Sequence, residues 1–226
     1  MKNIHVVGSL STAPTTPISP EECDIVEVRL DADLSSETIQ DLITPLNLPI
    51  LITARDIREG GCKDLTVAQR TALITQWIAQ AHYLDIELRN WSLMEDAIGL
   101  AHATQCQIIA SYHDFEKTPS QEELDALMKS ALEASPDIIK FAFFIQSLAD
   151  IERCQKLLFQ YQNLNISIMG MGPYAPVSRV LLAQSGSVLN YGYLGQNATA
   201  PGQWPARLLK EAITSCQPIH PPVPSL

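Results

Sequence analysis

The sequence has little positive charge, no long apolar run and no cluster of basic residues. Its 15 Lys and Arg residues are outnumbered by 25 Asp and Glu residues, and the formal net charge is −10. This balance argues against a general nucleic-acid or anionic-membrane binder, because both need a concentrated basic surface. The apolar run in "MKNIHVVGSL" is too short for a signal peptide, and no segment approaches membrane-spanning length. We therefore expect a soluble cytoplasmic protein with no nucleic-acid or membrane partner.

Paired cysteines and the motifs of common cofactor sites are missing. The five cysteines are scattered without a C-x-x-C pair: Cys23, Cys62, Cys106, Cys154 and Cys216. Reduced thiols fit this pattern better than a disulfide framework or a zinc site does. Neither G-x-G-x-x-G nor G-x-x-x-x-G-K-[ST] occurs, so nothing indicates a dinucleotide or a nucleoside triphosphate. A small anionic substrate is still compatible with the acidic balance, because a few clustered arginines reverse the field locally.

What the chain does have is a series of eight short apolar segments rich in β-branched residues. They predict strands at residues 3–9, 24–31, 49–55, 83–89, 107–113, 137–144, 165–170 and 186–192. Helical periodicity lies between them, as at 66–83, 121–134 and 148–162. Capping-box patterns at Thr66, Ser92 and Ser120 predict helix starts.

Strands that alternate with helices pair in parallel, because each crossover returns to the same end of the sheet. A count of eight favours a closed (β/α)8 TIM barrel over an open doubly wound sheet. We predict a single barrel domain over residues 1–215. The proline-rich stretch 216–226 is predicted to be a tail or the start of a linker.

The predicted strand "DIVEVRLD" separates an apolar face from a charged one. Val26 and Val28 fall on one face, and Glu27, Arg29 and Asp31 fall on the other. An antiparallel sheet with a solvated face also alternates, so this strand alone does not decide the fold. In a barrel the apolar face packs on helices, whereas charged side chains near the carboxyl ends of strands line a pocket. That is where barrel enzymes assemble their sites.

Lys140 is the most informative of the charged residues near strand ends. It lies within "DIIKFAFF", and an ammonium group surrounded by apolar side chains loses hydration, so its pKa falls. The neutral amine attacks carbonyls to form a Schiff base. A lysine that reaches solvent from an edge strand is the structural alternative, but a complete barrel has no edge.

His113 directly follows the apolar "QIIA", and its ordinary pKa suits a group that takes a proton and returns one near neutral pH. Asp85, one predicted strand away, is a candidate to hold the tautomer of the imidazole. Pairing of Asp85 with a helix N-terminus is an equally good interpretation.

Arginines and a loop near the C-terminus complete the candidates. Arg55 and Arg179 could hold an anion or a hydroxyl through their planar guanidinium groups, although most arginines form surface salt bridges. The loop "NATAPGQW" offers Thr199 and Gln203 for hydrogen bonding, unless it is simply a turn into the last helix.

Several motifs taken in order resemble the type I 3-dehydroquinate dehydratase family. They are "EVRLD", "TARDIREGG", "SYHDF", "IIKFA", "VSR" and "APGQ", and they cover nearly the whole chain. Their separations also fit the family, including the step from His113 to Lys140 (140 − 113 = 27 residues). The resemblance implies a (β/α)8 barrel, commonly dimeric, that needs no metal or organic cofactor and acts on 3-dehydroquinate. Some relatives are fused to a shikimate dehydrogenase, which leaves open that 216–226 is a linker or that such a partner associates.

The resemblance also implies a role for each matching residue. Lys140 would form an imine with the C3 ketone, and His113 would remove the C2 proton and protonate the departing C1 hydroxyl. Glu59 would support His113. The remaining matches would bind the substrate: Glu27, Arg29 and Arg55 hold ring hydroxyls, while Arg179 and Gln203 clamp the carboxylate. Thr199 stands where the family usually has serine, and it keeps the hydroxyl.

Two other functions deserve comparison. A class I aldolase or transaldolase would share the buried lysine, but it typically needs a phosphate site after strands seven and eight. "MGMGPY" and "GYLGQN" are partial candidates for such a site. A barrel retained only for binding would be expected to have lost a catalytic residue, yet Glu59, His113 and Lys140 are all present. Fold alone would not decide between these functions.

Overall fold

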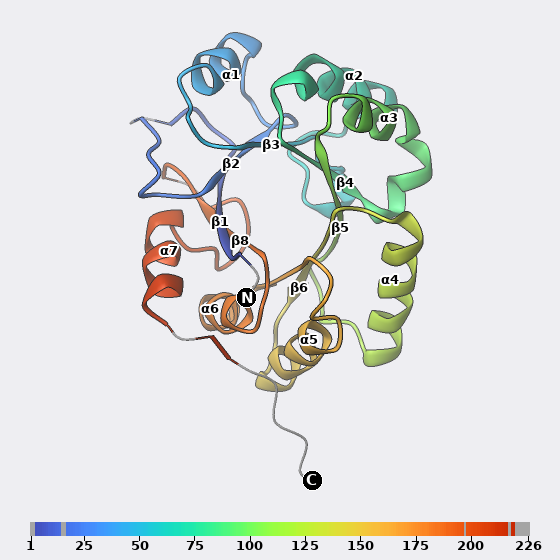
Figure 1. Cartoon of the computed structure of the whole chain (residues 1–226), viewed down its shortest axis with the longest axis vertical. Coiled ribbons are helices and arrows are strands. Elements are labelled where there is room, and N and C mark those ends of the chain that lie inside the picture. Colours follow the sequence, from blue (N-terminus) through green and yellow to red (C-terminus); the bar gives the residue numbers. More distant parts are fainter. Residues whose placement is uncertain (1–2, 15–16, 197, 217, 220–226) are drawn as a thin grey trace.

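Eight parallel strands form the middle of the molecule, and helices surround them (Figure 1). The structure, a computed structural model, describes residues 3–14, 17–196, 198–216 and 218–219. The strands are β1 (His5–Leu10), β2 (Ile25–Arg29), β3 (Ile50–Thr53), β4 (Tyr83–Glu87), β5 (Gln107–Asp114), β6 (Ile138–Phe144), β7 (Ile166–Met171) and β8 (Leu189–Tyr193). The helices are α1 (Ser36–Ile43), α2 (Val67–Trp77), α3 (Glu95–Ala103), α4 (Gln121–Ala134), α5 (Leu148–Gln160), α6 (Ala175–Gln184) and α7 (Ala206–Ser215). The predicted (β/α)8 barrel is confirmed.

The strands follow the order β7-β6-β5-β4-β3-β2-β1-β8, so strands that are neighbours in sequence are neighbours in space. Serine side chains help to close the seam between β7 and β8. Ser187 Oγ accepts a hydrogen bond from Ile168 N at 3.0 Å, and Ser167 Oγ accepts one from Leu189 N at 2.7 Å. Ser167 also donates to the Leu189 carbonyl oxygen at 2.7 Å. Hydroxyl groups therefore make bonds across this seam that main-chain groups make elsewhere in the barrel.

Helix starts follow the sequence in two of the three predicted cases. Thr66 and Ser120 cap α2 and α4, each in a complete capping box with the side chain three residues on. The prediction at Ser92 is wrong. This serine lies inside a short 3-10 helix, η3 (Leu88–Leu93), and α3 begins only at Glu95, after Met94. A residue inside a helical turn does not have the extended backbone that a capping serine needs.

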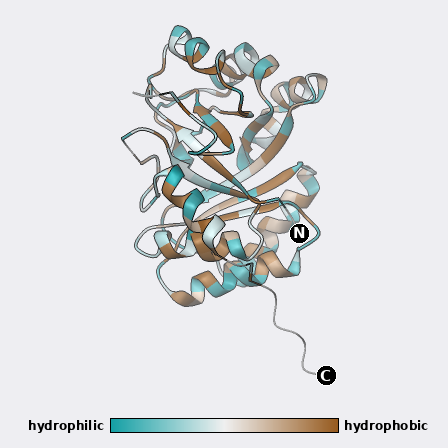
Figure 2. Cartoon of the chain, turned by 60° about the vertical axis from the view of Figure 1, so that its left-hand side comes forward, coloured by the Kyte–Doolittle hydropathy of each residue, from teal (hydrophilic) through white to brown (hydrophobic). Residues whose placement is uncertain are grey.

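The barrel separates two apolar regions. Outward-facing strand residues such as Val26 and Val28 pack against helix residues such as Ile74 and Trp77. Inside the barrel, an apolar layer that includes Val7, Ile25, Leu51 and Ile109 fills the end where the strands begin. Figure 2 shows the strands as largely hydrophobic and the helices as mixed, with hydrophilic residues towards solvent. The interior becomes polar only towards the carboxyl ends of the strands, and a site is therefore confined to that end.

The predicted domain boundary falls where the last helix stops. Helix α7 ends at Ser215, and of the predicted tail 216–226 the structure describes Cys216, Pro218 and Ile219. Ile219 N donates to the Gln184 carbonyl oxygen at 2.7 Å. The rest of that prediction lies outside the described residues. None of the helices that are described is both long and apolar enough to cross a membrane.

Candidate active site

A pocket opens at the carboxyl ends of the strands, and nine of the ten predicted site residues line it. These nine are Glu27, Arg29, Arg55, Glu59, His113, Lys140, Arg179, Thr199 and Gln203. They come from β2, β5 and β6, from segments after β3 and β8, and from helix α6. The tenth, Asp85 of β4, bonds to Lys140 from the wall of the pocket. The barrel therefore brings together residues that are as far apart in sequence as Glu27 and Gln203.

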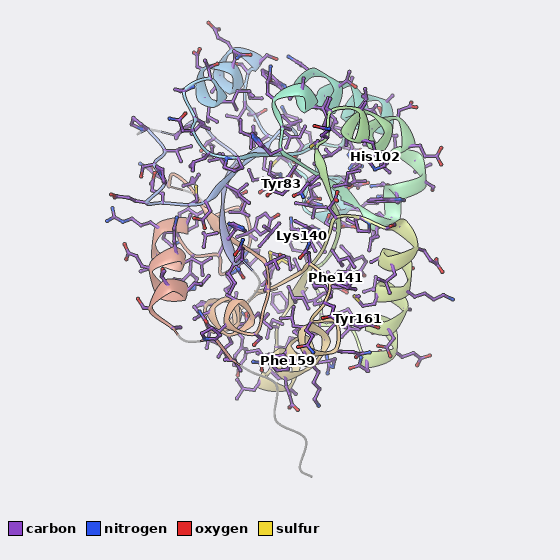
Figure 3. The ribbon with its side chains drawn as sticks, viewed as in Figure 1. Tyr83, His102, Lys140, Phe141, Phe159 and Tyr161 are labelled. Carbon is purple, nitrogen blue, oxygen red and sulfur yellow. The ribbon has the colours of Figure 1, made fainter. Side chains whose placement is uncertain are left out.

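Lys140 points into the barrel interior and is 3% exposed. Figure 3 labels it near the middle of the ring of strands, with Phe141 further out. Its Nζ lies 2.8 Å from Asp85 Oδ2 and 4.1 Å from the centroid of the Tyr191 ring. Burial lowers the pKa of Lys140, and the nearby Arg55 lowers it further, whereas the Asp85 carboxylate opposes both. The predicted solvent-free amine is therefore present, next to a single carboxylate that holds it in place.

Asp85 is held from both sides, and its position corrects one interpretation of the sequence. Its Oδ1 accepts from Ser111 at 2.6 Å, and its Oδ2 lies 2.9 Å from an Arg55 guanidinium nitrogen. Burial alone would raise the pKa of Asp85, but Arg55 and Lys140 bring it well below its usual range. The carboxylate contact to the imidazole of His113 is made by Glu59 instead. Asp85 therefore contacts the lysine, and the imidazole has Glu59 as its carboxylate partner.

The charges around Arg55 extend outward to helix α2. Arg55 lies 3.3 Å from Glu87 Oε1, and Glu87 Oε2 accepts a short hydrogen bond from Arg70. Arg70 comes from α2, is 1% exposed, and also donates to the Ala54 carbonyl oxygen at 2.6 Å. Buried charges of opposite sign thus alternate from Arg70 through Glu87, Arg55 and Asp85 to Lys140. Such a series fixes its three inner members, Glu87, Arg55 and Asp85, through two charged partners each.

His113 and Glu59 form a second pair in the same pocket. His113 Nδ1 lies 2.9 Å from Glu59 Oε2, which also accepts from the His113 main-chain N–H at 3.0 Å. Arg89 Nε lies 2.8 Å from Glu59 Oε1. With Glu59 ionised, Nδ1 carries the proton of the neutral imidazole and Nε2 is left as the basic nitrogen.

Burial shifts the pKa of both His113 and Glu59. It holds the pKa of His113 well below the usual value, and the positive charges of Arg55 and Lys140 act in the same direction. The imidazole is therefore neutral near pH 7 and able to accept a proton. Burial also raises the pKa of Glu59 to about 7, against the lowering effect of Arg55 and with a further increase from Glu87. Perturbed titration of this kind is typical of a catalytic site.

The register places the amine and the imidazole at different depths. Ser111 of β5 is level with Lys140 of β6, and His113 is level with Ala142. His113 therefore lies two residues, roughly 6.6 Å, nearer the mouth than Lys140 does. A small ring between them would meet the amine from below and the imidazole from above.

The charged face of β2 lines the pocket as its alternation predicts. Glu27 accepts from Ser9 through a short bond and from Thr53 at 2.8 Å. Arg29 forms a two-pronged pair with Asp31 at 2.9 and 2.7 Å, and it also donates to the Gly60 carbonyl oxygen at 3.0 Å. Asp31 does not line the pocket; it fixes Arg29.

Arg179 differs from the other buried arginines because it has no acidic partner among the described residues. It extends from α6 and donates a short bond to the Tyr191 carbonyl oxygen, while its Nε bonds to nothing that the structure describes. Burial lowers its pKa to about 10, so it stays charged near neutral pH. Across the loop, Gln203 Oε1 accepts from both Thr199 N and Thr199 Oγ1 at 2.8 Å, which leaves the Gln203 amide nitrogen as a donor. A guanidinium and an amide donor placed in this way can hold an anion with oxygen atoms.

Several residues of the site were missed in the sequence. Tyr191, Phe115, Met169 and Met171 line the pocket, yet each resembles ordinary core residues in the sequence. Arg70 did carry a signal, because it shares the buried face of α2 with Ile74 and Trp77, at i, i+4 and i+7. A charged residue in that stripe indicates an internal partner.

Comparison with known proteins gives one consistent result. A sequence model of the family "Type I 3-dehydroquinase" matches residues 12–219. The 3-dehydroquinate dehydratase of Methanococcus maripaludis strain S2 is 36% identical over 194 residues, which is 84% of this chain and 87% of that protein.

The solved structure of 3-dehydroquinate dehydratase from Enterococcus faecalis has a TM-score of 0.76 at 26% identity and covers 96% of this chain and 95% of that one. A dehydroquinate dehydratase and shikimate dehydrogenase structure from S. pombe has a TM-score of 0.71 at 20% identity. It covers 94% of this chain but only 44% of its own. That longer protein shows the fold alone.

Proposed function

This chain belongs to the type I 3-dehydroquinase family, and we propose that it dehydrates 3-dehydroquinate to 3-dehydroshikimate through a Schiff base on Lys140. The observation that carries the proposal is the buried amine of Lys140, which opens onto the same pocket as the imidazole of His113. Membership of the family makes this a lyase of the shikimate pathway. The roles of individual residues below are our proposal.

Imine formation begins at Lys140. Its lowered pKa makes the neutral amine more accessible than that of an exposed lysine, and Asp85 and the Tyr191 ring hold Nζ towards the pocket. The nitrogen lone pair attacks the C3 carbonyl carbon, and the electron pair of the carbonyl π bond moves to the oxygen. That oxygen takes up one proton from the attacking nitrogen and one from solvent and leaves as water, which gives a cationic imine. The cation withdraws electrons from the neighbouring carbon, and the proton at C2 becomes acidic.

His113 then moves a proton on one face of the ring. Its Nε2 takes the C2 proton, and the electron pair of that C–H bond passes into the imine to give an enamine. The enamine electrons return to expel the C1 hydroxyl, which receives a proton from the imidazolium and leaves as water. Glu59 supports both steps, because it accepts from Nδ1 and stabilises the imidazolium while it lasts. Hydrolysis of the conjugated imine releases the product and Lys140.

Substrate binding divides between the two sides of the pocket. Glu27, Arg29 and Arg55 present fixed carboxylate and guanidinium groups that suit ring hydroxyls. Arg179, with a buried unpaired Nε, and the amide nitrogen of Gln203 suit the carboxylate. The match to the family decides against an aldolase or transaldolase, and the complete set of catalytic residues in the pocket supports an enzyme over a binding domain.

The proposal is tested by reducing the enzyme with borohydride during turnover of 3-dehydroquinate. We expect a stable adduct on Lys140 by peptide mass mapping and a rise in ultraviolet absorbance from the enone product. Lys140→Met should abolish both adduct and product. His113→Ala should lower turnover by about 100-fold or more yet still allow the adduct, because general acid–base catalysis contributes roughly 10²–10⁴. An adduct on another lysine, or normal turnover by His113→Ala, would contradict these roles.

We also propose that the chain acts as a homodimer in the cytoplasm without a metal or organic cofactor, as the family resemblance implies. Light scattering at several protein concentrations tests the dimer. Retained turnover after dialysis against a chelator tests the independence from metal. Association with a shikimate dehydrogenase, which one structural relative contains in the same chain, is testable by co-purification.

A further inference from the structure

Tyr191 of β8 carries a buried hydroxyl that bonds to nothing among the described residues. The side chain is 4% exposed and lines the active-site pocket. A buried polar group without a partner costs folding free energy. Phenylalanine would fill the same space without that cost. The hydroxyl is therefore explained if its partner is something that enters the pocket.

The amine of Lys140 lies over the face of the Tyr191 ring. The centroid of this ring lies 4.1 Å from Lys140 Nζ, an arrangement in which a cation is attracted to an aromatic face. A hydroxyl on a ring this close to Nζ is within reach of an oxygen on a carbon that Nζ attacks. Arg179 binds the main-chain carbonyl of the same residue, which helps to fix its place.

The hydroxyl of Tyr191 is a donor and not a base. Burial raises its pKa well above the usual value, and the carboxylates of Glu27 and Asp85 raise it further, while Arg55 opposes them. The phenol therefore keeps its proton near neutral pH. Because both carboxylates already accept other bonds, the phenolic proton is left for another acceptor.

We propose that the Tyr191 hydroxyl is a further catalytic group, which donates a hydrogen bond to the substrate oxygen on the carbon that Lys140 attacks. The inference rests on the function proposed above. As the nitrogen–carbon bond forms, the electron pair of the carbonyl π bond moves to that oxygen, and the phenol stabilises the developing negative charge without losing its proton. A donor aimed at charge that develops in the transition state acts as the donors of an oxyanion hole do.

A structural role and a catalytic role make opposite predictions for Tyr191→Phe. If the hydroxyl stabilised the fold, its loss would lower the melting temperature. If the hydroxyl bonds only to substrate, the substitution removes an unpaired buried group from the empty protein. The melting temperature then stays the same or rises by up to about 3 °C. Turnover would then fall with no loss of stability.

The experiment compares the unmodified chain with Tyr191→Phe and Tyr83→Phe. Tyr83 is the matched control, because its ring packs against the same interior cluster from the opposite end of the barrel, away from the pocket. We expect Tyr191→Phe to lower both kcat and the single-turnover rate of adduct formation on Lys140 by about 10- to 100-fold. Tyr83→Phe should leave both within twofold.

Each outcome separates this inference from the proposed function. If the unmodified chain gives neither product nor adduct, the function fails and the inference fails with it. If the unmodified chain turns over but Tyr191→Phe keeps both rates within twofold, only the inference is overturned. A fall in melting temperature of several degrees in Tyr191→Phe, with rates lost in proportion to unfolded protein, would likewise assign the hydroxyl to the fold.

Discussion

The two sides of the pocket are built in opposite ways. On the side of β2 to β5, the buried charges that line or back the pocket have ionic or hydrogen-bonded partners, as in the pairs of Arg29 with Asp31 and of Arg70 with Glu87. Glu59 is bonded to His113 through Oε2, whereas its Oε1 contacts Arg89 as an ion pair and accepts no hydrogen bond from the described residues. On the side of β6 to β8, the lining is largely apolar, and Arg179 and Tyr191 keep polar atoms that bond to nothing the structure describes. The first side is therefore largely paired without substrate. In the proposed function, substrate supplies the partners that the second side lacks.

This contrast separates residues that stabilise the fold from residues that are free to bind a ligand. Paired buried charges hold a fixed geometry, because removing one partner leaves the other without compensation. Unpaired buried donors cost stability in the empty protein and regain it when a ligand supplies acceptors. Substitutions on the paired side should therefore lower stability, whereas substitutions on the unpaired side should lower the affinity for substrate.

The largest expected effect is on the paired side. Glu87→Gln removes the carboxylate between Arg55 and Arg70, leaving two buried cations close together. We expect the free energy of unfolding to fall by about 3–5 kcal/mol, measured by urea denaturation. The control is Glu95→Gln on the exposed surface of α3, which should change it by less than about 0.5 kcal/mol. A loss below about 1 kcal/mol for Glu87→Gln would remove the distinction between the sides.

The next effect is on the unpaired side. Arg179→Gln removes the buried guanidinium that has no acidic partner, and we expect KM to rise by about 100-fold, because hydrogen bonds to charged groups contribute roughly 1.5–3 kcal/mol. The free energy of unfolding should stay the same or rise, in contrast to Glu87→Gln. Steady-state kinetics and urea denaturation of one preparation give both numbers. Arg207→Gln, on the exposed face of α7, should leave KM unchanged, and a similar KM for Arg179→Gln would show that the guanidinium does not bind substrate.

The smallest expected effect is a shift in the pH dependence of kcat/KM when Arg89 is replaced. Glu59, whose pKa burial raises to about 7, should take up a proton as the pH falls through that value, so that kcat/KM of the unmodified chain declines on the acid side. Arg89, 2.8 Å from Glu59 Oε1, lowers that pKa. Arg89→Gln should therefore move the decline to higher pH by about half a unit, in line with a partly exposed ion pair. Arg153→Gln, on distant α5, is the control, and an unmoved profile in Arg89→Gln would contradict the assignment.

The pH dependence that Glu59 gives to stability has the opposite sign to the one expected for kcat/KM. Its pKa in the folded protein lies above the ordinary value of 4.5, so the folded state binds the proton more tightly than the unfolded chain does. The contribution of Glu59 to stability is therefore fully present below about pH 4.5 and is lost as the pH rises through about 7. In the proposed mechanism, activity requires the ionised form of Glu59, whereas folding favours the protonated form.

The fold was predictable because strand patterns are local. Residues such as Val26 and Val28 alternate with charged neighbours, and the alternation identifies the face that packs on helices whatever the partner is. Predicted strands agree with the observed ones to within a few residues at each end. The helix start at Ser92 was not predictable from its motif, because the preceding 3-10 turn takes that serine out of the extended conformation.

The site was predictable in its membership but less so in its contacts. Residue types near strand ends identified Lys140 and His113, since parallel strands bring their carboxyl ends together, and the family resemblance added Glu59. The partner of Asp85 was not predictable, because Lys140 is 55 residues away in sequence and the choice between it and His113 depends on the register of three strands. Tyr191 was missed for a different reason, because an aromatic residue in a buried strand is typical of a core.

The seam that Ser167 and Ser187 help to close has a consequence for how the enzyme loses activity on heating. Hydroxyl bridges leave fewer main-chain bonds between β7 and β8 than a full ladder would, so we expect their amide protons to exchange with solvent earlier than those of β3 and β4. Arg179 and Tyr191 belong to this sector. Inactivation should therefore precede the loss of far-ultraviolet circular dichroism, with the barrel parting at β7 and β8 while the rest of its wall is still intact.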